Sequence, residues 1–268
     1  MNESLGKTWF ACLIGGNGLR EGYPASVQVA DGAVGDLPAR FIAIVPDADN
    51  RFPRARNGEM GLLEGWYVAR AIREAMIADG ERKRAIVAVI DVPSQAYGRR
   101  EEAYGIHQAL AASAAAYTEA RLAGHPVIGL IVGKAISGGF LAHGYQANRL
   151  IAFDADSVTV HAMGKQSAAR ITLRSVEALE ALAADVPPMA YDVKNFASLG
   201  LLWDLLKLEN PGEPNAADQD IVRDALQRAL DDIRHDPGCG LTGRFGAPNR
   251  AASARVRETL RREWAASS

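Results

Sequence analysis

The amino-acid sequence predicts an α/β fold built on a mainly parallel, buried β-sheet. Near-continuous apolar runs predict buried strands over residues 39–45, 85–90 and 127–132. An amphipathic segment over 61–79 and an alanine-rich segment over 103–122 separate these runs and predict helices. Strands that are apolar on both faces and alternate with helices are typical of a parallel sheet covered by helices on either side.

The remaining elements are weaker predictions. Residues 26–30 alternate as a strand does, and Asp31-Gly32 then offers a hairpin turn. Short strands are expected over 150–153 and 157–160. The chain becomes helical after Gly164, and the helices are expected over 165–174, 176–184, 195–208, 217–233 and 251–264. We expect a single domain over residues 1–268, with a core over about 25–205 and a C-terminal helical extension over about 206–268.

Length and charge bound the classes of protein to which the chain can belong. Its 268 residues suffice for a large globular core. A formal net charge of −2 gives no overall case for nucleic acid or an anionic membrane as a partner. The most apolar run, 127–132, is far shorter than the ~20 residues that cross a bilayer, and residues 1–7 lack the pattern of a secretion signal. We therefore expect a cytoplasmic protein with no membrane or nucleic-acid partner.

The cysteines and histidines show no metal-binding pattern. Cys12 and Cys239 lie far apart in the sequence, and a reduced intracellular protein is favoured over a lone disulfide between them. No pair of histidines or carboxylates has the spacing of a zinc site, so no metal is expected.

Residues 127–140 carry the strongest functional signal. The apolar run ends at Gly133 and turns through Ser137-Gly138-Gly139 into a helix expected over 140–148. Backbone N–H groups at such a corner lack acceptors within the helix and lie at the positive end of its dipole. They can stabilise an oxyanion, as acyl-thioester chemistry requires. The structural alternative is that a tight strand-to-helix corner simply needs glycine, and serine as a helix cap.

A second loop favours the functional interpretation. Residues 93–97 follow the preceding strand, and in a parallel sheet both loops leave the carboxyl ends of strands, where ligands usually bind. Ser137 is a weak candidate for a nucleophile, because Ala135 breaks the Gly-x-Ser-x-Gly pattern. His143 and His161 are the nearest bases in sequence, and a lone histidine in such a place is more often structural.

Arginines gather on two loops that could border the same cleft. They could bind a phosphate or an acidic carrier surface. The alternative, solvated charge partly balanced by nearby carboxylates, is slightly favoured. The arginines are Arg51, Arg54, Arg56, Arg99 and Arg100, and the carboxylates are Asp47, Asp49, Glu101 and Glu102.

Longer strings around these loops resemble the carboxyltransferase branch of the crotonase superfamily. The resemblance is closest to the gamma subunits of biotin-independent malonate decarboxylase. Its strings are DVPSQAYGRREE (91–102), GKAISGGFLAHGYQAN (133–148), VHAMGK (160–165) and VPPMAY (186–191). The resemblance covers residues 40–205 well, and the ends only in length and general character.

The resemblance implies a crotonase-like ββα spiral with flanking helices. It implies a homologous beta (decarboxylase) subunit as partner, with the active site between the two subunits, together with an acyl-carrier subunit and an acyl-carrier transferase subunit. The substrate would be a malonyl thioester on the phosphoribosyl-dephospho-CoA arm of the carrier, and the products an acetyl thioester and CO2. The beta subunit would hold most of the arm. This chain is expected to bind no cofactor of its own, and we find no biotin-attachment sequence in it.

This family assignment gives each loop an expected role. Loss of CO2 leaves an enolate, so Gly138 and Gly139 would donate to the thioester oxygen while Ser137 caps the turn. Whether this corner or an equivalent one in the partner receives that oxygen stays open. The expected substrate-binding residues are Pro93, Ser94, Gln95, Ala96, Tyr97, Gly133, Lys134, Ala135 and Gly164. Two alternatives also stay open: a carboxyltransferase subunit of a biotin-dependent acyl-CoA carboxylase, and a non-catalytic scaffold that completes the partner's active site.

Overall fold

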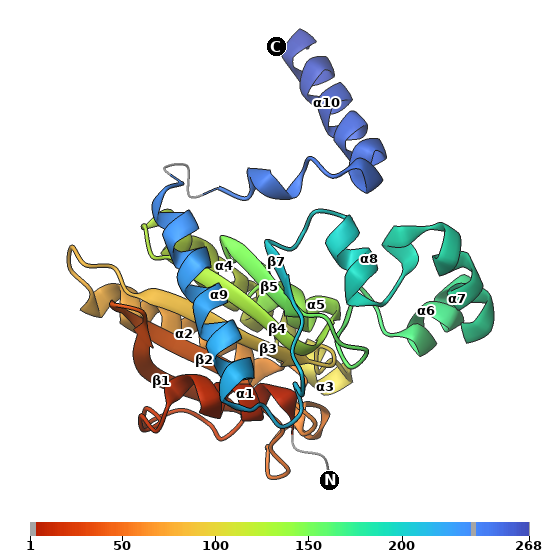
Figure 1. The fold of residues 1–268 in the computed structure, drawn as a ribbon. Coiled ribbons are helices and arrows are strands. Elements are labelled where there is room, and N and C mark those ends of the chain that lie inside the picture. The colour runs from red at the N-terminus through yellow and green to blue at the C-terminus, as the bar shows by residue number, and fades with distance from the viewer. Residues whose placement is uncertain (1–3, 237–239, 268) are drawn as a thin grey trace.

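A seven-stranded sheet forms the centre of the computed structural model, which describes residues 4–236 and 240–267 (Figure 1). The strands are β1 (Val27–Val34), β2 (Leu37–Ile44), β3 (Ala85–Val92), β4 (Val127–Ile136), β5 (Arg149–Phe153), β6 (Thr159–His161) and β7 (Asp204–Leu206). Their order is β1-β2-β3-β4-β5-β7, and β6 pairs with the end of β4. All pairings are parallel except that of β1 with β2. The predicted mainly parallel sheet is confirmed.

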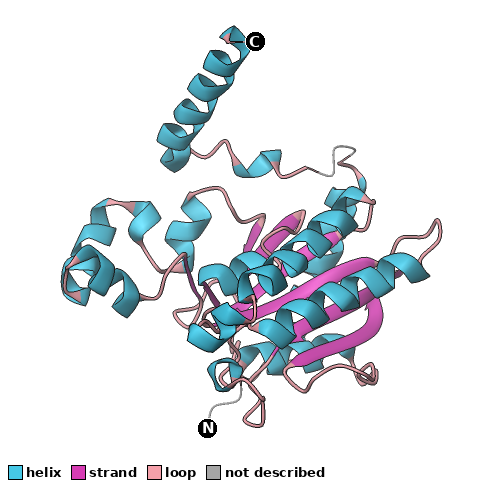
Figure 2. Ribbon diagram, turned by 180° about the vertical axis from the view of Figure 1, so that it is seen from behind, coloured by secondary structure: helices cyan, strands magenta, loops and turns pink. Residues whose placement is uncertain are grey.

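Helices cover both faces of this sheet. The helices are α1 (Leu5–Ile14), α2 (Leu62–Ala78), α3 (Arg99–Ala103), α4 (Ile106–Leu122), α5 (Ser137–Ala142), α6 (Lys165–Thr172), α7 (Val176–Asp185), α8 (Val193–Ser198), α9 (Ala216–Arg234) and α10 (Ala251–Ala266). α1 and α9 pack on one face, and α2 and α4 on the other, which Figure 2 shows from behind. Because both faces are covered, every residue of β3 over 85–90 is fully buried. This explains the near-continuous apolar runs.

Two local predictions at the N-terminal end are wrong. The hairpin turn lies at Gly35-Asp36, where Gly35 has φ of +56°, and β1 runs straight through Asp31 and Gly32. Asp31 faces Arg40 across the strands and accepts its Nε at 2.8 Å, so this carboxylate pairs within the sheet. Helix α1 was not expected from the polar N-terminus. It packs through residues of its apolar face, among them Trp9, which is fully buried.

Two helix predictions also need correction. The helix expected over 140–148 starts earlier, at Ser137, and ends at Ala142, because Gly144 takes a left-handed backbone (φ +87°). The helix expected over 195–208 is α8 followed by strand β7. Gly200 (φ +72°) separates the two elements, and β7 then pairs with β5.

The two C-terminal helices differ in burial: α9 packs on the sheet, and α10 is exposed to solvent. α9 buries an apolar face that includes Val222, Leu226 and Leu230, whereas α10 has no buried residue. The division into a core and a helical extension stays a prediction. Cys12 is half-buried on α1, and burial raises the pKa of its thiol. Cys239, its partner in the disulfide alternative, lies outside the described residues. None of the described helices combines the length and hydropathy needed to span a bilayer.

Candidate functional site

The corner after β4 carries a backbone that is unusual for its sequence. β4 continues past Gly133 to Ile136, and α5 begins at Ser137. Ser137 has φ of +64°, a left-handed conformation that costs a non-glycine residue free energy and is concentrated at functional sites. Gly138 and Gly139 complete the first turn of α5, whose N–H groups have no acceptor within the helix. The corner therefore presents backbone donors, and their action on an oxyanion stays a prediction.

The loop after β3 packs directly against this corner. A Cβ added to Gly139 would lie 2.5 Å from the carbonyl oxygen of Ser94, and a Cβ on Gly138 would collide with Oε1 of Gln95. That same Oε1 lies 3.5 Å from Oγ of Ser137. Close approach of the loop backbone thus requires Gly139, as the structural alternative holds, whereas the atoms near Gly138 belong to the movable Gln95 side chain. This approach also brings the Gln95 amide beside the backbone donors, as the functional interpretation expects. The expected serine cap is wrong, because Ile136 is the N-cap residue of α5 and no side chain of the described residues caps the helix.

A short segment before α2 holds the Gln95 loop from its other side. The N–H of Met60 donates to the carbonyl of Ser94 at 3.0 Å, and the N–H of Ala96 donates to the carbonyl of Met60 at 2.8 Å. These bonds add a strand-like bridge next to β3. The loop is therefore clamped between Met60 and the corner.

A fully buried carboxylate anchors this clamp. Glu64 on α2 accepts the N–H of Gly61 at 3.0 Å, the Ser26 hydroxyl at 2.6 Å and the Asn50 amide at 2.8 Å. Burial raises the pKa of the Glu64 carboxyl, and these donors oppose that rise. Sequence reasoning missed this residue, although a glutamate on the buried face of an amphipathic helix is a signal of such a role.

Asp91, at the end of β3, fixes the approach to the corner. Its Oδ1 accepts the N–H of Lys134 at 2.9 Å, and its Oδ2 accepts the N–H of Gly6 in α1 at 3.1 Å. A Cβ on Gly133 would collide with this carboxylate, so Gly133 serves close packing. Asp91 therefore ties α1 to β4, a role that was not predicted from the sequence.

An apolar pocket lies on one side of the corner. It has a volume of about 290 Å³, and its walls come from α5, β6, α8 and the turn before α8. Residues that line it include Ser137, Leu141, Tyr145, His161, Pro188 and Phe196. The second wall, from Pro188 to Phe196, was not predicted as part of the site.

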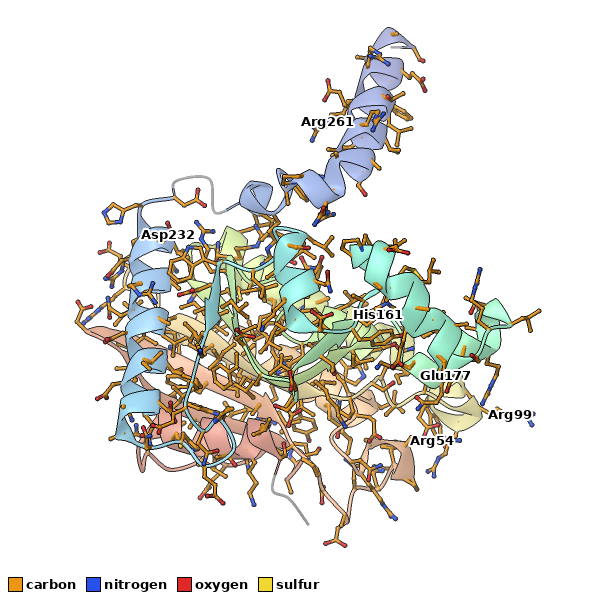
Figure 3. The ribbon with its side chains drawn as sticks, turned by 45° about the vertical axis from the view of Figure 1, so that its right-hand side comes forward. Arg54, Arg99, His161, Glu177, Asp232 and Arg261 are labelled. Atoms are coloured by element: carbon orange, nitrogen blue, oxygen red, sulfur yellow. The ribbon has the colours of Figure 1, made fainter. Side chains whose placement is uncertain are left out.

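A wider, charged pocket lies on the other side, across the Gln95 loop. It has a volume of about 870 Å³. Its lining combines Ser94 to Gly98 with Arg54, Arg99 and Arg170, and with Glu59 and Glu102. Figure 3 shows Arg54 and Arg99 close together at the edge of the molecule. Two of the five predicted arginines thus border one pocket.

The other loop arginines have local contacts. Arg51 and Arg100 lie over the ring of Phe52, at 5.1 and 5.4 Å from its centroid. Arg56 donates to the carbonyl of Asn50 at 3.1 Å. The structure therefore divides the arginine group into pocket residues and packing residues.

His143 has a structural environment. Its ring is fully buried, with Nδ1 3.0 Å from the hydroxyl of Tyr117 and Nε2 3.1 Å from the carbonyl of Val89. Burial lowers the pKa of His143 to about 4. The imidazole is therefore neutral at pH 7 and has no path to a substrate.

His161 lies at the site but makes no catalytic pair with Ser137. Its ring stacks on Tyr191, with centroids 3.9 Å apart, and its Nδ1 lies 2.9 Å from the carbonyl oxygen of Met163 and 3.1 Å from the N–H of the same residue. Burial lowers the pKa of His161, and the contact between its Nδ1 and the carbonyl of Met163 opposes that shift. Among the residues that the structure describes, no hydrogen bond joins Ser137 to a histidine. A serine nucleophile would need such a base.

The other predicted binding residues are less uniform. Ala135 is fully buried in β4, whereas Lys134 beside it is exposed. Pro93 and Gly164 line neither of the two pockets, although Gly164 begins α6 close to β6. Over the described ranges, no group of three His, Cys, Asp or Glu side chains is arranged to hold a metal ion.

Comparisons with known proteins agree with this geometry. The family model for the malonate decarboxylase gamma subunit matches residues 55–264. A chain of a Pseudomonas malonate decarboxylase hetero-tetramer, solved with coenzyme A, is 62% identical with a TM-score of 0.94, over 97% of this chain and 100% of that chain. A chain of the Pseudomonas MdcD–MdcE hetero-dimer is 58% identical with a TM-score of 0.90, over 97% and 99%.

Two more distant matches are a relative found by sequence and a solved structure with the same fold. The malonyl-S-ACP:biotin-protein carboxyltransferase MADD of Malonomonas rubra is 33% identical over 230 residues, which are 84% of this chain and 75% of that protein. A transcarboxylase 12S chain is 19% identical with a TM-score of 0.62, over 84% of this chain and 41% of that chain. The predicted crotonase-like architecture is confirmed. The chain belongs to the malonate decarboxylase gamma subunit family.

Proposed function

We propose that this chain pairs with a homologous beta (decarboxylase) subunit and that the pair converts malonyl-S-acyl-carrier protein to acetyl-S-acyl-carrier protein and CO2. The active site would lie between the two subunits. The assembled state of the Pseudomonas relatives supports this proposal, since their structures are a hetero-dimer and hetero-tetramers, one of the latter in complex with malonate.

The observation that carries the chemical role is the corner at residues 137–139. When the bond between the α-carbon and the carboxylate of the malonyl group breaks, its electrons move onto the thioester oxygen and CO2 leaves. Backbone N–H groups of Gly138 and Gly139 would stabilise that oxygen more in the transition state than in the ground state. One such donor lowers the activation barrier by about 3 kcal/mol. A proton then adds to the α-carbon to give the acetyl group.

The apolar pocket beside Ser137 suits the departing carboxylate. A carboxylate without a cation partner is costly in an apolar environment, whereas CO2 is neutral. The negative charge then lies on the thioester oxygen at the Gly138 and Gly139 donors, outside the apolar pocket. Leu141, Pro188 and Phe196 line the pocket. His161 also lines it, and burial lowers the pKa of this histidine, which favours its neutral form. The pocket would therefore raise the free energy of the reactant relative to the products.

The carrier would approach from the charged side. We propose that the malonyl group arrives on the phosphoribosyl-dephospho-CoA arm of an acyl-carrier subunit, loaded by an acyl-carrier transferase subunit. The chain would bind no cofactor of its own. Arg54 and Arg99, at the edge of the 870 Å³ pocket, supply the positive charge for phosphate groups or an acidic carrier surface. A cytoplasmic location is part of the same proposal, which cell fractionation tests.

A second candidate function rests on the relationship to MADD. That relative transfers a carboxyl group to a biotin protein and shares 33% identity with this chain. The same corner could then serve carboxyl transfer to biotin in place of CO2 release.

Reconstitution separates these functions. The chain is co-expressed with the beta and carrier subunits, and acetyl-thioester formation from malonyl carrier is measured with and without avidin. The proposal expects turnover that needs both subunits and is unaffected by avidin. Inhibition by avidin would establish the carboxyltransferase function. An intact complex with no turnover would overturn the decarboxylase assignment.

A further inference from the structure

Helix α10 stands out because nothing in the described chain buries it. Figure 1 shows it projecting beyond the sheet and its covering helices, at the end of an extended segment. Its 16 residues, Ala251 to Ala266, include no buried residue. The guanidinium of Arg257 lies 3.9 Å from the ring centroid of Phe245 in the segment before it. α10 is thus attached at one end and exposed along its length.

The exposed surface of α10 has a pattern. Val256, Leu260 and Trp264 are spaced four residues apart and therefore share one face of the helix. Their side chains are 60%, 61% and 80% exposed. The apolar stripe runs over most of a helix about 24 Å long.

The source of helix stability indicates that this stripe is covered by another protein surface in the assembled enzyme. Protein helices owe most of their stability to the packing of an apolar face against other elements. α10 has such a face but packs it on no other element of the described chain to the point of burial. A second protein surface is the simplest way to bury this exposed face.

The family comparison indicates which kind of protein covers α10. The match to the gamma subunit family runs from residue 55 to 264, so it includes α10 up to the last stripe residue, Trp264. A helix that its own chain leaves exposed, but that belongs to the region shared by the family, fits a partner that the family shares.

Charge gives the chemistry of the partner surface. α10 carries four arginines and two glutamates between residues 251 and 266. We propose that α10 is a docking arm for the beta subunit, with its stripe seated in an apolar groove that has an acidic rim. This inference rests on the proposed function, which supplies the beta subunit. A stable interface buries about 800 Å² per partner, more than one stripe provides. α10 would therefore be one part of a larger interface.

Binding measurements test this arm directly. Leu260→Glu and the double variant Leu260→Glu/Trp264→Glu are compared with wild type in the full-length chain, and the affinity for the purified beta subunit is measured by calorimetry. Ile77→Glu is the matched control, since Ile77 is an 85% exposed apolar residue at the C-terminal end of α2, on a different helix from the stripe. We expect at least ten-fold weaker binding for the single variant and a larger loss for the double variant. Ile77→Glu should bind as wild type, and all variants should have wild-type melting temperatures.

Hydrogen exchange gives an independent measure. The amides of α10 should exchange rapidly in the isolated chain and become protected when the beta subunit is added. Wild-type affinity of the double variant, or unprotected α10 amides in the complex, would overturn the docking arm while leaving the proposed function standing. Self-association of the isolated chain that Leu260→Glu abolishes, with beta affinity unchanged, would make a second copy the occupant. Failure of the wild-type chain to bind the beta subunit would overturn both proposals.

Discussion

Alanine substitution at two adjacent glycines should have very different effects, because the two positions face different atoms. At Gly139 a Cβ would lie 2.5 Å from the carbonyl oxygen of Ser94 and 2.7 Å from Cγ1 of Val92. One neighbour is backbone and the other is a fully buried side chain, so relief requires the β3 loop to move away from the corner. At Gly138 the Cβ would meet the end of the Gln95 side chain, which can rotate away.

The expected magnitudes follow from these contacts. Overpacking of a tight site costs about 1–3 kcal/mol, so Gly139→Ala should lower the free energy of unfolding by that amount. For a domain of this size the melting temperature falls by about 2–4 °C per kcal/mol. Gly138→Ala should change stability by less than about 0.5 kcal/mol, as most substitutions do where a neighbour can move freely. In the assembled enzyme, Gly139→Ala keeps its backbone N–H but displaces it as the corner and the β3 loop move apart. Turnover should therefore also fall, by up to about 10²–10³, the effect of removing one oxyanion donor.

Thermal unfolding and turnover of the two variants, measured in parallel, test this reasoning. Equal melting temperatures for Gly138→Ala and Gly139→Ala would refute the close approach of the Ser94 carbonyl. A destabilised Gly139→Ala enzyme with wild-type turnover would refute the oxyanion role of this turn while leaving the packing argument intact.

Further predictions concern the buried titratable and anchoring groups. The pKa of His143 is about 4 in the native state against an ordinary 6.5, so its contribution to stability is present above pH 6.5 and is lost as the pH falls toward 4, by up to about 3 kcal/mol. Urea unfolding from pH 7 to 4 should show this loss, and His143→Gln should flatten the dependence. Asp91→Asn places an amide donor against the N–H of Lys134 or Gly6, so the free energy of unfolding in urea should fall by about 1–2 kcal/mol. Unchanged stability would contradict the role of Asp91 in joining α1 to β4. Glu64→Gln leaves one of the buried donors to this side chain without an acceptor. The free energy of unfolding should fall by about 1–3 kcal/mol, and turnover should fall because the Gln95 loop loses its support. Full stability with full turnover would show that this carboxylate does not support the loop.

The sequence predicts the sheet well because burial leaves a continuous signal. Residues 85–90 are apolar without interruption since helices cover both faces of β3, and that pattern needs no knowledge of tertiary contacts. The meeting of the Gln95 loop with the corner could also be foreseen. Adjacent parallel strands place their carboxyl ends together, here with Val92 opposite Ala135.

Long-range contacts explain what the sequence could not predict. Asp31-Gly32 looks like a turn, but the Arg40 guanidinium across the strands holds Asp31 in β1. The clamp on the Gln95 loop depends on Glu64, and the corner on Asp91, through partners that lie tens of residues away in sequence. Pairing at such distances has no local sequence signature. The apolar wall at Pro188 and Phe196 likewise reaches the corner through tertiary packing.

The central claim is that the corner at Gly138 stabilises the enolate in a site shared with the beta subunit. The most direct test is the single-turnover rate of CO2 release from malonyl carrier by the assembled complex that contains Gly138→Val, whose Cβ would meet the Gln95 amide that lies beside the backbone donors. We predict a loss of at least about 10²-fold with subunit assembly unchanged. Full-rate CO2 release from that intact complex would contradict the claim and leave the chain a scaffold for its partner.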